Sequence, residues 1–237
     1  ADRFGVPVIG DVELFAQART DLPPHKGVGI TGTNGKSTTT ALTHHILKQA
    51  SVPTTMGGNI GLPILEQDPL PEGGVYVLEL SSYQIDLTYS LDCDVAVLLN
   101  ITPDHLDRYD GDFQKYAASK SRLLAMQKRG QNSIARFTDA CDILGLSGAQ
   151  IRAGLESYRG LPHRMERVAE VAGVAYVNDS KGTNTAASAP ALAAFDNIHW
   201  ILGGLAKEPG LGECEAELPR VKAVYTIGKA GPDFAAL

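Results

Sequence analysis

The segment that most constrains this chain is residues 29–38, with the sequence GITGTNGKST. Its glycines allow backbone N–H groups to turn inward, Lys36 adds a positive charge, and the Ser37 hydroxyl is a ligand for a phosphate-bound Mg²⁺. An apolar run at 28–30 predicts a buried strand before the loop, and the pattern over 37–50 predicts a helix after it. This order predicts an anion site at a helix N-terminus, where the backbone carries about half a positive charge.

The loop departs from the strict P-loop pattern, which has a glycine at the position of Ile30. A glycine-rich turn without a ligand is the alternative interpretation. The Lys-Ser pair directly after Gly35, at a predicted strand-to-helix junction, favours a phosphate site. The loop alone leaves open whether it serves an enzyme or a nucleotide-dependent switch.

Length and charge narrow the class of partner. The 237 residues fit one large domain or two small ones, and 21 basic against 27 acidic residues give a formal charge of −6. This balance argues against nonspecific binding to nucleic acid or to an anionic membrane. No apolar run approaches the roughly 18 residues that span a bilayer, so no membrane insertion is expected.

The cysteines and the first residues bear on the compartment. Cys93, Cys141 and Cys214 have no metal-binding spacing and form no even-numbered disulfide framework, so we expect reduced thiols in a cytoplasmic protein. Residues 1–15 lack the basic and apolar parts of a secretion signal. The sequence begins with Ala1 rather than Met, which indicates a processed or truncated start.

Apolar runs and helical stretches alternate along the chain. Strands are predicted at 28–30, 75–80, 95–99, 174–177, 199–202 and 221–227. Helices are predicted at 37–50, 112–128 and 185–194, and from Ser147, with Gln150 placed for a capping box. The alternation predicts an α/β fold with a mostly parallel sheet, helices on both faces and ligands at the carboxyl ends of strands. A break in periodicity at 161–168 predicts a boundary before a second, shorter α/β domain.

Polar residues follow two of the predicted strands. Glu79 ends one strand, where a carboxylate is suited to bind Mg²⁺ or metal-bound water; a glutamate turned to solvent is the alternative. His105, between Asp104 and Asp107, follows the next strand and is a candidate metal or substrate ligand. A lone loop histidine is more often a surface residue, but a shared sheet edge with Glu79 favours a functional role.

The second half of the chain offers cations after its own strands. Arg164 is able to pair with phosphate oxygens, and Lys181 and Lys207 to neutralise carboxylate or phosphate, although each lies in what is otherwise an ordinary turn. Together they predict a site closed between two domains. Spacing alone indicates that Lys115 and Lys120, on the helix predicted at 112–128, are solvated surface charges.

A set of motifs in this chain resembles those of the Mur ligases. They are TGTNGKST at 31–38, GGNIG at 57–61, ELSSYQ at 79–84, NITPDHLDRY at 100–109, YAASK at 116–120, GLPHRME at 160–166 and NDSKGTN at 178–184. ELSSYQ and GNIG are most similar to the D-glutamate-adding members of the family.

The resemblance implies a P-loop-type central ATPase domain with a partial Rossmann-like C-terminal domain, in a monomeric enzyme of peptidoglycan synthesis in the bacterial cytoplasm. Its substrates would be UDP-N-acetylmuramoyl-L-alanine and D-glutamate. The substrate carboxylate attacks the γ-phosphate of ATP, which releases ADP and forms an acyl phosphate, and the amine of D-glutamate then displaces phosphate. Such a site must shield phosphoryl charge and exclude water.

The resemblance also implies roles for individual residues. Lys36, Glu79, His105, Lys120 and Lys181 would be catalytic. ATP would be held by Gly32, Thr33, Asn34, Gly35, Lys36, Ser37, Thr38, Arg164 and Asp179. Two Mg²⁺ sites would use Ser37 with Glu79, and His105 with a carbamylated Lys120. The substrates would contact Asn59, Gln84, His105, Lys181, Thr183 and Lys207, with Thr183 and Lys207 at the incoming D-glutamate.

The family pattern is incomplete in this chain. Residues 1–25 are expected as a lead-in from a missing N-terminal uridine-nucleotide domain, 26–160 as the central ATP-binding domain, and 161–237 as a partial C-terminal ligase domain. Near 130–132 the strands and the adenine-binding motif of the family are missing, and the family's C-terminal D-glutamate clamp is missing too. We interpret the first as an internal gap in the sequence, because losing core strands would expose a sheet edge.

Two other functions remain open. Another Mur ligase or a folylpolyglutamate-synthase-like ligase would keep the fold and change the substrate, and ELSSYQ with DHLDRY argues against it. A non-catalytic nucleotide-binding module would need no second cationic site, so Lys181 and Lys207 argue against it.

Overall fold

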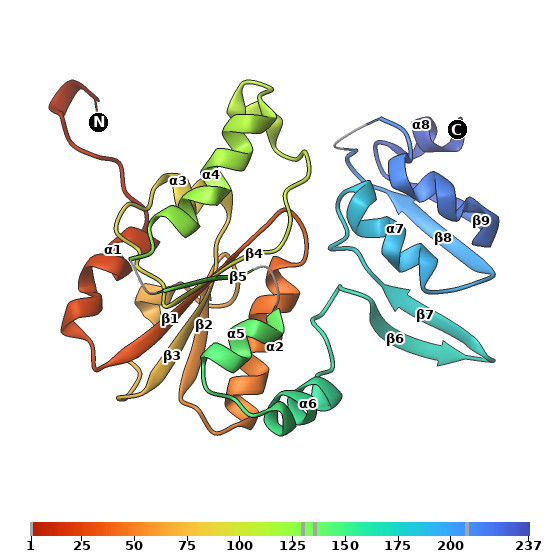
Figure 1. Ribbon diagram of the computed structural model, residues 1–237. Coiled ribbons are helices and arrows are strands. Elements are labelled where there is room, and N and C mark those ends of the chain that lie inside the picture. Colours follow the sequence, from red (N-terminus) through yellow and green to blue (C-terminus); the bar gives the residue numbers. More distant parts are fainter. Residues whose placement is uncertain (1, 129–130, 135–136, 207–208) are drawn as a thin grey trace. The chain divides into compact units, whose positions relative to one another are not determined.

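The structure is a computed structural model that describes residues 2–128, 131–134, 137–206 and 209–237. The chain divides into two compact units, residues 1–159 (unit 1) and residues 160–237 (unit 2) (Figure 1). Residues 1–25, which we expected as a lead-in, are part of unit 1. In the described part of the chain no helix is both long and apolar enough to cross a membrane.

Unit 1 is built on a five-stranded parallel sheet. Its strands are β1 (His25–Thr31), β2 (Thr54–Gly58), β3 (Gly74–Glu79), β4 (Val95–Leu98) and β5 (Asn132–Ile134), in the spatial order β2-β3-β1-β4-β5. Every neighbouring pair is parallel, so the carboxyl ends of β1, β3 and β4 meet at one edge. The glycine loop, Glu79 and the polar loop around His105 therefore all begin at this edge.

Helices cover both faces of the sheet. In chain order they are α1 (Asp11–Ala18), α2 (Lys36–Gln49), α3 (Ser82–Asp86), α4 (Phe113–Ala125), α5 (Phe137–Ile143) and α6 (Gly148–Ser157). Val75 and Val77 of β3 pack with α2, α5 and α6, whereas Tyr76 and Leu78 pack with α1, α3 and α4. Alternate residues of one strand thus enter two separate cores, because successive side chains point to opposite faces.

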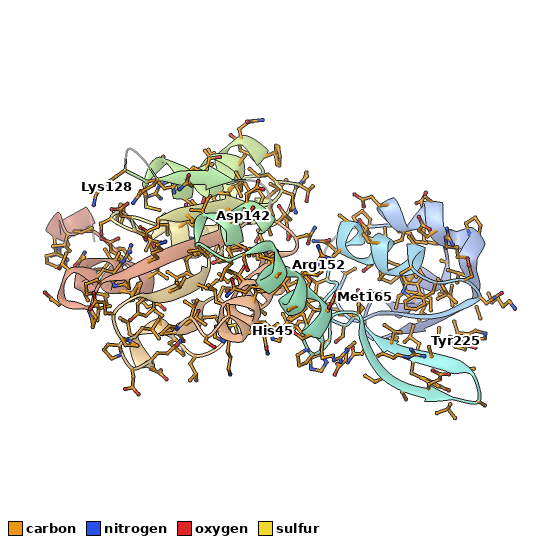
Figure 2. All side chains as sticks on the ribbon, turned by 60° about the horizontal axis from the view of Figure 1, so that its bottom comes forward. His45, Lys128, Asp142, Arg152, Met165 and Tyr225 are labelled. Atoms are coloured by element: carbon orange, nitrogen blue, oxygen red, sulfur yellow. The ribbon has the colours of Figure 1, made fainter. Side chains whose placement is uncertain are left out.

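The helices α2, α5 and α6 lie next to one another, as the positions of His45, Asp142 and Arg152 show in Figure 2. A Cβ at Gly154 of α6 would lie 2.5 Å from Ile46 Cγ1, so only glycine permits this approach of α6 to α2. Short 3₁₀ helices occur at η1 (Asp2–Phe4), η2 (Arg19–Asp21), η3 (Ile64–Glu66) and η4 (Leu106–Tyr109).

The strongest sequence patterns of unit 1 are confirmed. The predicted strands at 28–30, 75–80 and 95–99 are β1, β3 and β4, and the predicted helices at 37–50 and 112–128 are α2 and α4. Ser147 and Gln150 form the predicted capping box of α6. Strand β2, whose sequence TTMGG contains no apolar run, was not predicted, and neither were the short elements α1, α3, α5 and β5.

Unit 2 contains two small sheets. An antiparallel hairpin pairs β6 (Glu166–Val171) with β7 (Val174–Asn178), and a parallel pair joins β8 (Ile198–Gly203) to β9 (Val221–Ile227). Its helices are α7 (Thr185–Ala193), η5 (Gly212–Arg220) and α8 (Gly231–Ala235). The predicted strand at 174–177 is β7, whereas its partner β6 was not predicted. The hairpin turns at Ala172 (φ +49°) and Gly173 (φ +77°), as a two-residue turn with positive φ requires. The predicted α/β class with a mostly parallel sheet is confirmed, and the Rossmann-like character of unit 2 stays a prediction.

Candidate functional site

The loop between β1 and α2 requires glycine at two positions. Gly32 has a φ of +151°, and a Cβ there would lie 3.1 Å from Leu99 Cβ and 3.2 Å from the amide nitrogen of Asn100. Gly35, with a φ of +85°, is the N-cap residue of α2. A glycine cap has no side chain to accept from the first-turn N–H groups, which favours an anion as their acceptor.

Lys36 folds back over this loop. Its Nζ donates to the carbonyl oxygens of Gly32 at 2.9 Å and Thr33 at 2.8 Å. The ammonium charge is therefore held within the loop, beside the N-terminus of α2. In the same first turn Ser37 is half-buried and Thr38 is exposed.

Hydrogen bonds fix the glycine loop to the segment after β4. The amide of Thr33 donates to the carbonyl of Asn100 at 2.9 Å, and Asn34 N donates to Asn100 Oδ1 at 2.9 Å. Thr33 Oγ1 lies 3.0 Å from each of three partners: Thr102 O, Thr102 N and the hydroxyl of Tyr116 on α4. Loop, segment and helix therefore form one hydrogen-bonded assembly.

Glu79, the last residue of β3, is 1% exposed. Its Oε1 accepts from Asn59 Nδ2 at 3.0 Å, whereas its Oε2 is buried with no hydrogen-bond partner among the described residues. A buried carboxylate oxygen without a donor is costly, and a cation removes that cost. Glu79 therefore fits the predicted Mg²⁺, which prefers carboxylate oxygen ligands.

Lys120 lies in the interior of unit 1, at 2% exposure on α4. Its Nζ donates to the carbonyl oxygen of Gly32 at 2.9 Å and lies 4.8 Å from the centre of the Tyr116 ring. Burial, assisted by the charge of Lys36, lowers the pKa of Lys120 to about 7. The interpretation of Lys120 as a surface charge is wrong, because the fold buries that side of α4.

The other lysine of α4 behaves as its spacing predicts. Lys115 is exposed, and its Nζ pairs with Asp110 Oδ2 at 2.7 Å. The pair raises the pKa of Lys115 and lowers that of Asp110 through the hydrogen bond and the attraction between the two charges. Lys115 is thus a natural control for Lys120.

His105 lies at the surface, immediately before η4. Its side chain is 43% exposed, and its Nε2 is 3.6 Å from Asp104 Oδ2. Its backbone has a φ of +52°, and the centre of its ring is 5.5 Å from that of Tyr83. The imidazole is therefore accessible to a ligand at the carboxyl edge of the sheet.

Gln84 has a local role that its motif does not reveal. The side-chain Oε1 of Gln84 accepts from Ser81 N at 3.1 Å and from Ser81 Oγ at 3.0 Å. The backbone amide of Gln84 donates to Ser81 Oγ at 3.2 Å. This capping box begins α3, which starts three residues after Glu79. Across the described residues, no three His, Cys, Asp or Glu side chains gather into a metal-binding cluster.

In unit 2, two loops bring predicted residues together. Met165 N donates to Asp179 Oδ1 at 2.9 Å, and Lys181 N donates to the carbonyl of His163 at 3.0 Å. The segment that carries Arg164 therefore packs against the segment at 178–182.

The predicted site residues fall into both units. Unit 1 brings together the glycine loop, Asn59, Glu79 and Lys120 at one sheet edge. In unit 2, Lys181 and Thr183 are exposed and Arg164 is half-buried. Lys207 lies outside the described residues.

Three residues that contact the glycine loop or α4 in unit 1 were not predicted from the sequence. Thr102 contacts Thr33 of the loop through its backbone carbonyl and amide, the Tyr116 hydroxyl contacts the same residue, and the Asp86 carboxylate accepts from Ser119 of α4. The spacing of Tyr116, four residues before Lys120, was a signal for Tyr116 because such residues share a helix face.

A glycine loop between a buried parallel strand and a helix, with a carboxylate at the end of the neighbouring strand, defines a P-loop-type nucleotide-binding protein. The family profile described as the Mur ligase middle domain matches residues 30–150. The chain belongs to the Mur ligase family.

Sequence relatives agree with this assignment, and solved structures share the fold. Proteins named UDP-N-acetylmuramoylalanine–D-glutamate ligase are 56% identical over 281 residues in Novosphingobium aromaticivorans and 51% over 283 in Sphingopyxis alaskensis. Each alignment covers 98% of this chain, which spans 63% and 65% of the two relatives. MurF ligase from Thermotoga maritima in complex with ADP has a TM-score of 0.70 at 20% identity, covering 92% of this chain and 69% of its own. E. coli FolC in complex with DHPP and ADP has a TM-score of 0.60 at 15% identity, covering 98% and 87%. These two likenesses show the fold.

The aligned region is longer than the chain itself, at 281 against 237 residues. The relatives therefore carry residues within the aligned region that this sequence lacks.

Proposed function

We propose that the full-length protein is an ATP-dependent amide ligase that adds D-glutamate to UDP-N-acetylmuramoyl-L-alanine through an acyl phosphate. The names of the relatives in Novosphingobium and Sphingopyxis support this substrate pair. The observation that carries the proposal is the buried Glu79 carboxylate, whose Oε2 has no hydrogen-bond partner in the described residues, on the strand next to the glycine loop. The proposed enzyme is a monomer of the bacterial cytoplasm.

The phosphate groups of ATP would bind at the N-terminus of α2. The loop residues Gly32, Thr33, Asn34 and Gly35 would present backbone N–H groups, and the first turn would add Lys36, Ser37 and Thr38. Lys36 would move its ammonium from the loop carbonyls to the β- and γ-phosphates, since a phosphate is the stronger acceptor. From unit 2, Arg164 would contact the γ-phosphate and Asp179 the nucleotide.

Mg²⁺, when bound, neutralises phosphate charge during transfer. Glu79 and Ser37 would hold one ion, and His105 with a carbamylated Lys120 a second. The lowered pKa of Lys120 supports the carbamate, because only a neutral amine attacks CO₂. The neutral amine nitrogen would bond to the carbon of CO₂ and lose one proton, which would turn a neutral amine into a carboxylate-like anionic ligand.

Positioning of the two substrates would involve both units. Asn59, Gln84, His105 and Lys181 would contact the muramoyl substrate, and Thr183 with Lys207 the incoming D-glutamate. Lys181 would neutralise negative charge on the acyl phosphate, the electrostatic stabilisation that such a transfer requires.

Release of phosphate tests the proposal. The full-length protein is incubated with ATP, Mg²⁺ and UDP-N-acetylmuramoyl-L-alanine, and either D-glutamate or L-lysine is added. We expect amino-acid-dependent phosphate release with D-glutamate only. Release with L-lysine and none with D-glutamate would assign the protein to another branch of the family, and no release with either would reject ligation.

A further inference from the structure

Asp86, the last residue of α3, receives side chains from two other segments. The hydroxyl of Tyr109 donates to Asp86 Oδ2 at 2.9 Å, and Ser119 Oγ donates to Oδ1 at 2.6 Å. Arg108 Nε and Arg122 Nη1 each lie 3.8 Å from the carboxylate. Tyr109 and Arg108 belong to η4, and Ser119 and Arg122 to α4, so one carboxylate connects three segments.

Each of these segments adjoins a predicted metal ligand. Helix η4 follows His105, whose carbonyl accepts from the amide of Arg108 at 3.1 Å. Ser119 directly precedes Lys120 on α4, and α3 begins three residues after Glu79. The Asp86 carboxylate therefore bonds to Ser119, directly before Lys120, and to Tyr109, four residues after His105.

We propose that Asp86 is a positioning residue that holds the His105 loop against the Lys120 helix and thereby sets the affinity of the protein for its divalent cation. This inference rests on the proposed function, in which His105 and a carbamylated Lys120 would hold a metal ion. Removal of a group that orients metal ligands without binding the metal itself commonly lowers metal affinity about 10–100-fold.

The hydroxyl bonds, rather than the ion pairs, carry this positioning. Tyr109 and Ser119 are buried and the Asp86 side chain is 27% exposed, so their bonds to the carboxylate are partly shielded from water and fix its geometry. The side chains of Arg108 and Arg122 are 42% and 37% exposed, and ion pairs of that kind contribute little. The effect of Asp86 on the metal should therefore be reproduced by Tyr109→Phe, which keeps the ring and removes only the hydroxyl.

Metal affinity in the full-length protein tests the proposal. Binding of Mn²⁺ is measured by EPR in the presence of a non-hydrolysable ATP analogue, for wild type, Asp86→Asn, Tyr109→Phe and Ser119→Ala. The matched control is Asp94→Asn, because Asp94 also accepts a buried donor, the amide of Gly27 at 2.7 Å, but lies at the other edge of the sheet. We expect about 10–100-fold weaker Mn²⁺ binding in the first two variants, and wild-type binding in the control.

Steady-state kinetics distinguish a loss of metal-ligand positioning from a general loss of activity. In the phosphate-release assay the Mg²⁺ concentration for half-maximal rate should rise, whereas the KM for D-glutamate should not change. Wild-type Mn²⁺ affinity in Tyr109→Phe and Asp86→Asn would overturn the inference, even if both variants unfold at lower temperature. If Asp86→Asn does not fold, the Mn²⁺ affinities of Tyr109→Phe and Ser119→Ala test the inference instead. The proposed function fails separately, through the wild type releasing no phosphate with D-glutamate.

Discussion

Lys36 and Lys120 donate to one acceptor, the carbonyl oxygen of Gly32, each at 2.9 Å. Two ammonium groups on one oxygen repel each other, and this repulsion adds to burial in lowering the pKa of Lys120 to about 7. The glycine loop and the buried lysine of α4 are therefore electrostatically linked before any ligand binds. A change at Lys36 should consequently be felt at Lys120.

Replacing Lys36 by methionine should reduce carbamylation of Lys120. Without the neighbouring charge the pKa of Lys120 rises, so a smaller fraction of the amine is neutral at pH 7.5 and able to attack CO₂. The carbamate carbon is measured by ¹³C NMR of the full-length protein in ¹³C-bicarbonate. Lys48→Met, at the exposed far end of α2, is the control. An equal carbamate signal in Lys36→Met and wild type would contradict the link.

Replacing Lys120 by alanine should abolish ligation, and short carboxylates such as acetate should partly restore it. The small acid would occupy the space left by the side chain and supply the missing metal ligand. Phosphate release with D-glutamate is measured with and without acetate, with Lys115→Ala as the control on the same helix. Full activity in Lys120→Ala would exclude a carbamate role, and inactivity at every acetate concentration would leave no support for it.

The buried amine should also make stability depend on pH. The pKa of Lys120 is about 7 in the folded protein against 10.5 for the free side chain. Between these values the unfolded chain holds a proton that the folded protein has released, so the folded state gains stability as pH rises. Relative to Lys120→Met, wild type should gain at most about 1.4 kcal/mol per pH unit above pH 7. Urea unfolding without metal or CO₂ at pH 6, 7, 8 and 9 measures this, and a constant difference across that range would contradict it.

Local patterns were sufficient to predict the strand, loop and helix that we propose as the phosphate site. Each signal lies within a few neighbouring residues: the apolar run before Gly32, the glycines of the loop and the helical pattern after Lys36. The position of Glu79 at the carboxyl end of a strand was equally predictable, because the end of an apolar run can be read from the sequence. By contrast, β2 was missed because its sequence contains no apolar run, and its place in the sheet comes from pairing with the distant strand β3.

The rest of the site depends on contacts between distant segments. The sequence spacing predicted that Lys120 is a surface charge, and only the family resemblance assigned it a functional role. Its burial results from α4 packing on the sheet, which places its Nζ on Gly32, 88 positions away in the chain. The same long range explains why Thr33, Thr102 and Tyr116 could not be connected from sequence periodicity, which reports only on residues within one element.

Replacing Tyr116 by phenylalanine should loosen the glycine loop and leave Lys120 covered. The substitution removes the hydroxyl that lies 3.0 Å from Thr33 Oγ1 and keeps the ring over the Lys120 amine. We expect a loss of about 1 kcal/mol in the free energy of unfolding, as for a typical buried hydrogen bond, and a higher KM for ATP. Tyr89→Phe is the control, because that hydroxyl is in an exposed contact with Val8. Equal effects of the two substitutions on the KM for ATP would contradict the role of the Thr33 contact.

Replacing Gly58 by alanine should disturb the end of β3 that carries Glu79. Gly58 has a φ of +88°, and a Cβ there would lie 2.2 Å from the carbonyl oxygen of Glu79. Gly73→Ala is a matched control, because Gly73 has a φ of +80° and open space around its Cβ position. Both substitutions carry the strain of a left-handed alanine, about 1–2 kcal/mol, and only Gly58→Ala adds the clash with backbone. The free energy of unfolding in urea and the affinity for Mn²⁺ should both be lower in Gly58→Ala than in Gly73→Ala. The end of β3 must move in Gly58→Ala, and the Glu79 carboxylate moves with it. Similar unfolding and metal affinity in the two variants would show that the end of β3 is free to shift without consequence for the metal site.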